Sequence, residues 1–335
     1  MKKKFHDGLE VYRGDNFDEL PVQDTFEYPF QGELLALLKK ENPLKQEYFY
    51  IKKGTSYAFF VLYYNRMNLF TFGKATLFYP VKVVGFPCSF SSSGYVTNDE
   101  AFLMEYLNTI KGAKLVLNAE KKAVHPKWIT GETLPACILE LQDGKHAGFE
   151  NMERYINLLR SPYRRRIRKA IKACGDIKVV SNGKDSRVYD LYLNTYEKSD
   201  YKLERLEAGF FETFQGENII FYRGEKPVGF VLLKDVGKRL DFLFCGMDYK
   251  EKTADLYFYM LYHIVKLGIE RGYESIDLGQ TSELTKMKFG AVPRKKYFYA
   301  SHSNAMMRLV LKMGKGLLEY HYSFPEFRVF KEETE

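Results

Sequence analysis

The fold is decided by residues 240–279, which run LDFLFCGMDYKEKTADLYFYMLYHIVKLGIERGYESIDLG. The first part, 240–245, is apolar and aromatic apart from one aspartate, which is typical of a strand. The part from 253 to 270 has the apolar periodicity of a long helix, and Gly272 is well placed to end that helix. Residues 275–278 predict the next strand. Strand, long helix and strand therefore follow one another here.

The elements around this stretch extend the order in both directions. The pattern predicts a strand, a helix capped by Asp185, a second helix and a hairpin before the stretch, and a short helix and a last strand after it. These elements are expected at residues 177–180, 188–195, 203–214, 218–222 with 228–233, 282–289 and 297–299.

The N-terminal half repeats this order weakly. Its expected elements are a helix, a hairpin, two strands, a helix capped by Asn98 and two strands, at residues 31–40, 47–51 with 57–62, 69–72, 81–86, 98–111, 114–117 and 136–141. The repeat predicts an α+β protein of two similar halves, each a mixed, mostly antiparallel sheet flanked by helices. We expect domains at 1–150 and 176–335, joined by a basic helix at 151–175.

Length and composition agree with two ordinary globular domains. The chain has 335 residues, of which 45% are hydrophobic and 28% charged. No stretch approaches the ~20 apolar residues that cross a membrane. The four cysteines lie far apart without a C-x-x-C pair, and the histidines have no metal-ligand spacing. We therefore expect a cytoplasmic protein with no membrane span and no metal.

The excess positive charge is concentrated near the middle of the chain. The net charge is +8, and seven basic residues but no acidic one lie between Arg160 and Lys172. Within this segment Ile167, Ala170 and Ile171 are spaced as one apolar stripe of an amphipathic helix. The charged face has two interpretations: it is simply solvated, or it binds donor phosphates or RNA.

Three short motifs carry a resemblance to a known family. They are the basic stretch 164–173 (RRRIRKAIKA), the strand 272–279 (GYESIDLG) and the stretch 286–290 (KMKFG). Together with the order of elements, they resemble the GNAT acyltransferases, and within these the Fem-type and related proteins with two GNAT halves. Those proteins have an R-x-x-I-R-K-A helix between their halves, a G-x-x-x-x-D-x-G strand and a K-x-x-F-G motif.

The resemblance implies an N-acyltransferase with a degenerate N-terminal half and a catalytic C-terminal half. Relatives that bind acyl-CoA usually have Q/R-x-x-G-x-G/A before the long helix, whereas residues 246–253 here (GMDYKEKT) lack those glycines. A helix N-terminus binds phosphate without them. The implied co-substrate is acyl-CoA, with aminoacyl-tRNA, which Fem-type relatives use, as the alternative. The implied acceptor is a small amine-bearing molecule or a cell-wall precursor.

The family places its acyl donor between two splayed strands, here the strands that end at Cys245 and Gly279. Backbone groups of the first strand and of the helix start are expected to face the donor. They belong to Leu243, Phe244, Cys245, Gly246, Met247 and Thr253. Because strands alternate faces, some of these side chains are core residues whatever the function.

Lys286 is the leading catalytic candidate. It lies four residues before Gly290, where many GNAT enzymes place a tyrosine that protonates the leaving group. A lysine at that place binds phosphate, stabilises an oxyanion, or donates a proton if its pKa is lowered. The alternative is a solvated helix lysine, and Lys288 is a nearby competitor.

Two aspartates complete the catalytic candidates, because Asp241 and Asp277 lie in otherwise apolar strands. A carboxylate at a buried face acquires a raised pKa and can serve as a general base. Asp277 has the better case, since Gly279, Gln280 and Thr281 follow it. The alternative is an aspartate at a strand edge that points to water.

The substrate-binding candidates come from several elements. They are Tyr257, Gln280, Tyr297, Arg164 and Arg168. Core packing is the alternative for each tyrosine. Two functions stay open from the sequence: N-acyl transfer, and a catalytically silent GNAT-like module that binds RNA or tRNA through its basic helix.

Overall fold

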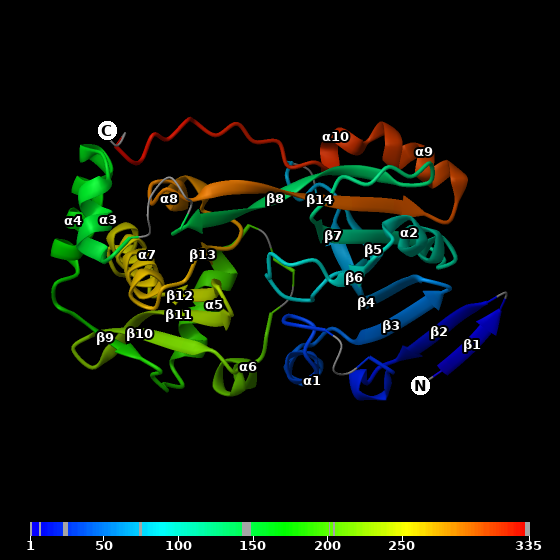
Figure 1. Cartoon of the computed structure of the whole chain (residues 1–335), viewed down its shortest axis with the longest axis horizontal. Helices are drawn as coiled ribbons and strands as arrows, with labels where there is room; N and C mark the ends of the chain where they lie inside the picture. Colours follow the sequence, from blue (N-terminus) through cyan, green and yellow to red (C-terminus); the bar gives the residue numbers. More distant parts are fainter. Residues whose placement is uncertain are drawn as a thin grey trace. The chain divides into compact units, whose positions relative to one another are not determined.

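The computed structural model describes residues 2–6, 8–22, 26–73, 76–142, 149–200, 202–203 and 205–331 (Figure 1). The chain forms two compact units, each with its own run of strands and its own core. Unit 1 contains Met1–Leu134, Tyr201–Phe210 and Lys295–Tyr322, and unit 2 contains Pro135–Asp200, Phe211–Arg294 and Ser323–Glu335. Within the described part of the chain, no helix has the length and apolar character needed to cross a bilayer.

Unit 1 is built on a sheet with strand order β1-β2-β3-β4-β5-β7-β14, and β6 pairs with β4. Its strand pairs are antiparallel except for the parallel pair β5 and β7. The elements are β1 (Lys2–His6), β2 (Leu9–Gly14), the 3-10 helix η1 (Phe17–Glu19), α1 (Gly32–Glu41), β3 (Gln46–Lys53), β4 (Ser56–Asn68), β5 (Phe78–Val84), β6 (Tyr95–Thr97), α2 (Glu100–Asn108), β7 (Ala113–Ala119), β14 (Val292–His302), α9 (Ala305–Met313) and α10 (Lys315–Leu318).

Unit 2 is built on a sheet with strand order β8-β13-β12-β11-β10-β9. Here too one pair is parallel, β12 with β13, and the other pairs are antiparallel. The elements are β8 (Ile129–Glu140), α3 (Met152–Leu158), α4 (Ser161–Ala173), β9 (Ile177–Ser181), α5 (Val188–Lys198), α6 (Ala208–Thr213), β10 (Glu217–Arg223), β11 (Lys226–Val236), β12 (Arg239–Met247), α7 (Thr253–Glu270), β13 (Ser275–Asp277) and α8 (Glu283–Met287).

The long helix α7 is the main support of the unit 2 sheet. It buries Met260, Leu261 and Ile264 completely against the strands, and a buried side chain of this size contributes about 2 kcal/mol by leaving water. Gly272 follows the last turn with φ +72°, a left-handed conformation that glycine adopts without strain. Helix and sheet therefore fix where β12 and β13 end.

Each unit takes one strand from the other half of the sequence. The strand expected at 136–141 is part of β8 and pairs in unit 2, where Ile138 is opposite Asp277. The strand expected at 297–299 is part of β14 and pairs in unit 1, where Tyr297 is opposite Ala119. The compact units are therefore not the contiguous halves that the sequence suggests, because an alternating pattern identifies a strand without specifying its partner.

The α+β class with mostly antiparallel sheets is confirmed, but some local expectations are wrong. Residues 69–72 form a turn and not a strand. The Asn68 side chain closes this loop by accepting hydrogen bonds from the backbone N–H groups of Phe70 and Leu77. The helix expected at 203–214 is limited to α6.

Two expected helix caps are also wrong. Asp99, and not Asn98, caps α2 by accepting a hydrogen bond from Phe102 N at 3.0 Å. Asp185 lies before the start of α5 and accepts hydrogen bonds from the backbone and the guanidinium of Arg187. In both places the expected cap side chain accepts another hydrogen bond: Asn98 accepts from Tyr57 N, and Asp185 accepts from Arg187 N.

Candidate active site

The parallel strands of unit 2 separate at a defined point. β12 and β13 pair from Arg239–Ser275 to Asp241–Asp277, where β13 ends. β12 continues for six further residues to Met247. Among the described residues no strand pairs with this edge of β12 beyond Asp241. The edge from Phe242 to Met247 therefore presents backbone groups that no neighbouring strand satisfies.

A β-bulge in β12 lies at the start of this open edge. Leu233 of β11 is opposite Phe242 and Leu232 is opposite Phe244, so Leu243 has no partner on β11. A bulged residue redirects the side chains that follow it. Phe242 belongs to the core that includes α7, whereas Phe244 contacts Tyr192 of α5.

The bulge determines which predicted donor residues face α7. Cys245 and Met247 pack on the core that includes α7. Gly246 faces α5, and a Cβ there would lie only 2.4 Å from the Leu191 carbonyl carbon. Glycine is thus required at this position by the close approach of the α5 backbone. The expected donor strand is in place, with alternate residues on opposite faces of the sheet.

Lys286 is buried within unit 2, with 2% of its surface exposed. Its Nζ donates hydrogen bonds to the carbonyl oxygens of Gly279 at 3.1 Å and Gln280 at 2.7 Å. Burial lowers the pKa of the Lys286 ammonium, and the neighbouring groups of Cys137, Cys245 and Asp277 oppose that change. The interpretation of Lys286 as a solvated helix lysine is therefore wrong.

The loop that Lys286 holds is strained. Thr281 and Ser282 have φ of +61° and +52°, in the left-handed region that β-carbon-bearing residues rarely adopt. Such residues cost of order 1 kcal/mol each and are retained where the surroundings fix them. The two hydrogen bonds from Lys286 supply that fixing, and they join α8 to the end of β13.

Tyr257 and two thiols surround the Lys286 ammonium. Tyr257 extends from α7, its hydroxyl is hydrogen-bonded to Ser282, and burial raises its pKa well above 10. Burial also raises the pKa of the Cys245 thiol to about 11 and that of the Cys137 thiol to about 12, while the Lys286 charge opposes both increases. Both thiols are therefore protonated at neutral pH, and so is the phenol.

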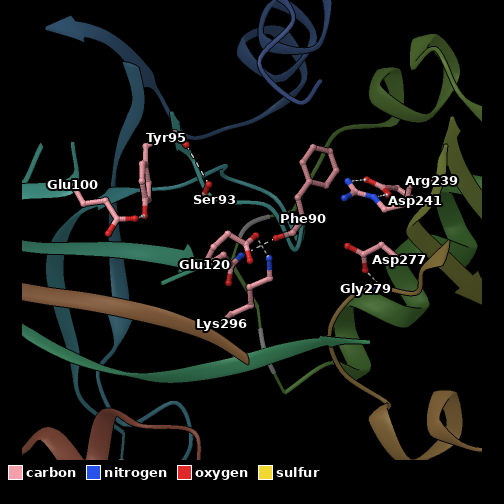
Figure 2. Close-up of polar contacts among 11 residues, drawn as sticks. Phe90, Ser93, Tyr95, Glu100, Glu120, Arg239, Asp241, Asp277, Gly279 and Lys296 are labelled. Carbon is pink, nitrogen blue, oxygen red and sulfur yellow. Dashed lines mark hydrogen bonds and ion pairs between the residues drawn. The ribbon is translucent and has the colours of Figure 1, made fainter. Parts of the chain in front are cut away.

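The two predicted aspartates lie opposite each other on the paired part of the strands. Asp241 is paired with Arg239 through Nε–Oδ1 and Nη2–Oδ2 distances of 2.6 and 3.1 Å. Asp277 accepts a hydrogen bond from Gly279 N at 2.7 Å (Figure 2). Both residues are buried, so neither is the solvated strand-edge aspartate that was the alternative. The charge of Asp241 is therefore compensated by Arg239.

The N-terminus of α7 has no side-chain cap. Thr253 is its first residue, and the Thr253 side chain lies outside the described part of the structure. The acidic residues nearby are paired: Asp248 with Lys226, Glu251 with Arg223, and Asp255 with Arg166. The Asp255 N–H bonds back to Lys252 O at 3.2 Å, so the N–H groups of Thr253 and Ala254 are the first-turn donors open to a ligand, and the adjacent acidic charge is neutralised.

The single basic helix expected at 151–175 is two helices, α3 and α4, and the basic run lies on α4. Arg166 packs its guanidinium 3.9 Å above the Phe258 ring and binds Asp255. Arg164 is partly buried and donates to Asn157 O at 3.4 Å. The outer face carries four exposed cations spaced as one helical stripe, Arg165, Arg168, Lys169 and Lys172. Part of the charge is thus structural, and part is available to a partner.

Tyr297 lies in unit 1 and not with the other candidates. It lines a cavity of about 270 Å³ together with Lys122, Glu132, Tyr320 and Tyr322. The exchange of β14 between the halves explains this outcome, since the sequence could not show that residues 295–302 belong to unit 1. Gln280, in contrast, is at the site through its carbonyl group.

The structure adds three residues that the sequence interpretation missed. Cys137 comes from β8, more than a hundred residues before the rest of the site, and no pattern links it to the others. Ser282 and Glu283 stand at the start of α8, and Glu283 is buried near Lys286. A serine followed by a glutamate at a helix start is a capping signal, which hides any other role. The described residues contain no cluster of side chains suited to a metal ion.

Comparison with protein families gives one match in this region. Residues 159–287 match the model described as "Acetyltransferase (GNAT) domain". The matched segment begins beside α4 and ends in α8, so it contains β12, α7, β13 and Lys286. No curated protein matches the chain.

Several solved structures are similar over most of the chain. The structure of L-PGS from Bacillus licheniformis is 12% identical and covers 89% of this chain and 100% of its own, with a TM-score of 0.51. A tandem GNAT protein from the clavulanic acid biosynthesis pathway is 10% identical over 88% of this chain and 99% of its own, with a TM-score of 0.49. FemX is 13% identical over 82% and 92%, with a TM-score of 0.45. At 12% identity the likeness to the first of these structures shows the fold alone.

Proposed function

We propose that this chain, whose residues 159–287 match a GNAT acetyltransferase domain model, transfers an acyl or aminoacyl group to an amine in unit 2. One observation carries the proposal: β12 extends past the end of β13, beginning at the Leu243 bulge, with Lys286 and Tyr257 beside the open edge. Unpaired backbone groups on a strand edge hold an extended ligand by adding it to the sheet.

The donor lies along that edge in this proposal. An extended acyl-bearing arm pairs with the backbone of residues 243–247, and its phosphates lie at the uncapped start of α7. The N–H groups of the first helical turn take the place of the glycine-rich loop that the sequence lacks. Acyl-CoA fits this arrangement as co-substrate, and the 3′ end of an aminoacyl-tRNA is the alternative donor.

The chemistry requires an oxyanion partner and a proton for the leaving group. The amine attacks the carbonyl carbon, a C–N bond forms, and the C–S or C–O bond to the carrier breaks. Lys286 uses two of the three N–H donors of an ammonium group on Gly279 and Gln280. The third donor stabilises the developing oxyanion.

Proton transfers are assigned to two further groups. Tyr257, whose raised pKa keeps it protonated, donates the proton that the departing thiolate or ribose oxygen takes up. Asp277, which lies at the end of β13 and accepts a hydrogen bond from Gly279 N, takes up the proton lost by the amine. The acceptor is a small amine-bearing molecule or a cell-wall precursor that approaches Gln280.

The direct experiment is a donor screen with product detection. We expect isothermal titration with coenzyme A, acetyl-CoA and longer acyl-CoAs to give heat, and mass spectrometry to show acylated amines. Titration at millimolar ligand without heat would exclude a CoA donor. The screen is then repeated with aminoacyl-tRNA, and failure of both donors would remove the acyltransfer proposal.

The exposed stripe on α4 favours a second function, RNA or tRNA binding without catalysis. Arg165, Arg168, Lys169 and Lys172 present four cations on one face with no acidic residue on the helix. Binding through phosphates loses affinity steeply as salt rises, in proportion to the number of contacts.

Filter binding with tRNA over a salt series tests this function. The doubly substituted R168E/K172E protein should lose tRNA binding, and Lys52→Glu on an exposed strand of unit 1 is the matched charge control. If tRNA binds and is not consumed as a donor, the silent-module function holds. If no RNA is retained at low salt, the stripe is simply solvated.

A further inference from the structure

The C-terminal helices of unit 1 carry an apolar face that no described residue covers. In α9, Met306, Leu309, Val310 and Met313 are 69%, 58%, 55% and 81% exposed. These positions are spaced i, i+3, i+4 and i+7, so they lie within an arc of about 100° on one side of the helix. Leu317 of α10 continues the exposed set at 59%.

The opposite side of α9 holds the helix on unit 1. Leu311 packs with Phe298 and Ala300 of β14, and Leu318 of α10 joins the same cluster. Asn304 caps the first turn by accepting from Met306 N and Met307 N. The helix is therefore well formed and anchored, so its outward apolar stripe is presented by folded structure.

A second apolar segment of unit 1 lies next to these helices. Phe72, in the loop between β4 and β5, contacts Tyr320, which follows α10, with ring centroids 5.0 Å apart. Leu77 at the end of this loop and Phe78, the first residue of β5, are 48% and 55% exposed. Two separate segments thus add exposed apolar side chains to one region of unit 1, which is uncommon on a solvated surface.

Basic residues lie on these helices. Residues 302–318 contain Arg308, Lys312 and Lys315, of which Arg308 donates to the carbonyl oxygens of His302 and Ser303 and Lys315 is paired with Glu319 at 3.4 Å. Lys312 is exposed and lies about 60° from the edge of the apolar stripe at Leu309 by the helical period. A helix with an apolar stripe bordered by cations lies in the interface of an anionic lipid layer, with the stripe among the acyl chains.

The same charge argues against a second copy of the chain as occupant. In a two-fold dimer the same patch meets itself. Lys312, at the border of the stripe, would then approach its own counterpart. A lipid surface, in contrast, supplies phosphate groups for Lys312 and an apolar phase for Met313.

We propose that α9 and α10 of unit 1 form a surface that inserts into the interface of an anionic lipid bilayer. The tip residues Leu77 and Phe78 add a second point of insertion. The proposal does not depend on the acyltransfer reaction, because α9 and α10 belong to unit 1 and contain none of the residues placed at the unit 2 site.

The test is vesicle co-sedimentation of the full chain. Vesicles of phosphatidylglycerol mixed with phosphatidylcholine should bind at least about tenfold more tightly than phosphatidylcholine alone, with a loss of binding at high salt. The double variant L309D/M313D should weaken binding by about tenfold or more, since each aspartate removes a buried apolar side chain. Val124→Asp, at a residue that is 95% exposed in the same unit, is the matched control.

A fluorescent reporter separates insertion from simple charge attraction. The chain has one tryptophan, Trp128, which is buried, so Met313→Trp adds a single surface probe. We expect its emission to shift to the blue only with anionic vesicles. Absence of vesicle binding at low salt would overturn the proposal, as would binding without a blue shift. A concentration-dependent dimer that L309D/M313D abolishes, without vesicle binding, would assign the surface to a second copy instead.

Discussion

The two units contain the same parallel strand pair with different endings. In unit 1, β5 pairs with β7 from Val81–Ala113 to Val84–Val116, and Val84 is the last residue of β5. In unit 2, β12 continues six residues past its last pair with β13. The β4–β5 register has no shift, whereas the β11–β12 register skips Leu243. In unit 1 the first strand of the pair therefore ends at its last paired residue, whereas in unit 2 the first strand extends beyond it.

The helices that follow β5 and β12, α2 and α7, differ in whether a side chain caps their N-terminus. Asp99 caps α2 in unit 1 and also accepts a hydrogen bond from Ser56, which together hold its pKa below the ordinary value. In unit 2 no side chain caps α7. A capped helix start satisfies its own backbone donors, and an uncapped one leaves them for a ligand. The side-chain cap therefore stabilises the start of α2 in unit 1, whereas the start of α7 in unit 2 keeps backbone N–H groups available to a ligand.

Each unit also buries one lysine against backbone carbonyls. Lys114 of unit 1 donates to Ile110 O and Gly112 O, and burial lowers its pKa to about 8. Lys286 of unit 2 donates to the strained loop after β13. Of the two, Lys286 lies beside the open edge of β12, so we propose a structural role for Lys114 and a catalytic role for Lys286.

The largest expected effect is on turnover in Lys286→Met. Loss of one oxyanion donor cuts turnover by about 10²-fold or more, while the apolar stem keeps unit 2 folded. Lys114→Met should alter the melting temperature and leave turnover unchanged. Steady-state kinetics and thermal unfolding measure both. Lys288→Met, at the end of α8, is the control within unit 2, and equal effects of the three substitutions would assign Lys286 a purely structural role.

An acid-dependent loss of stability should appear in unit 2. The pKa of His263 on α7 is lowered from its ordinary 6.5 to about 4 by burial among aromatic rings. The folded state therefore prefers neutral histidine, and the unfolded state binds more protons as pH falls from about 6.5 to about 4. Stability is complete above that window and falls by about 2 kcal/mol within it, after allowance for partial exposure.

His263→Phe should remove this pH dependence, because phenylalanine does not titrate and fits the same aromatic surroundings. Urea unfolding monitored at pH 7 and pH 4.5 provides the free energies. A variant that loses as much stability as the parent between these two conditions would show that another group is responsible.

A side-chain cap added to the N-terminus of α7 should make it resemble the capped N-terminus of α2. Lys252→Asp places a carboxylate at the N-cap position, where it competes with donor phosphates for the first-turn N–H groups. We expect the KM for the donor to rise by about tenfold and kcat to change little. Lys250→Asp, two residues earlier, controls for the added negative charge, and an equal rise in both variants would refute binding at the helix start.

The converse substitution in unit 1 has the smallest expected effect. Asp99→Ala removes the cap of α2 and should cost about 1 kcal/mol of stability. Donor KM and turnover should stay at the parent values, because unit 1 holds no donor in this account. A change in donor KM would show that the degenerate half takes part in binding.

The sequence predicts local elements well where a single pattern decides them. The bounds expected for α7 are those observed, because its apolar spacing and Gly272 agree. The GNAT resemblance is confirmed for residues 159–287. The burial of Lys286 was one of two open interpretations, because a lysine in a short helix has the same sequence pattern whether it is buried or exposed.

What could not be predicted depends on contacts between distant residues. The exchange of β8 and β14 moved Tyr297 into unit 1 and brought Cys137 to Lys286, and no local signal encodes either outcome. The Leu243 bulge depends on its pairing with β11 and cannot be seen in an apolar run. Arg239 and Asp241 are two residues apart in the sequence, but only the structure shows that the arginine neutralises the charge of the buried carboxylate.

We propose that the open edge of β12, and not its counterpart β5 in unit 1, receives the acyl donor. Hydrogen–deuterium exchange with and without the donor that the protein turns over tests this directly. We predict slower exchange of backbone amides in 243–247 and 253–257, and unchanged exchange in 84–104 of unit 1. Slower exchange confined to unit 1, or none in 243–247 with the donor bound, would contradict the claim.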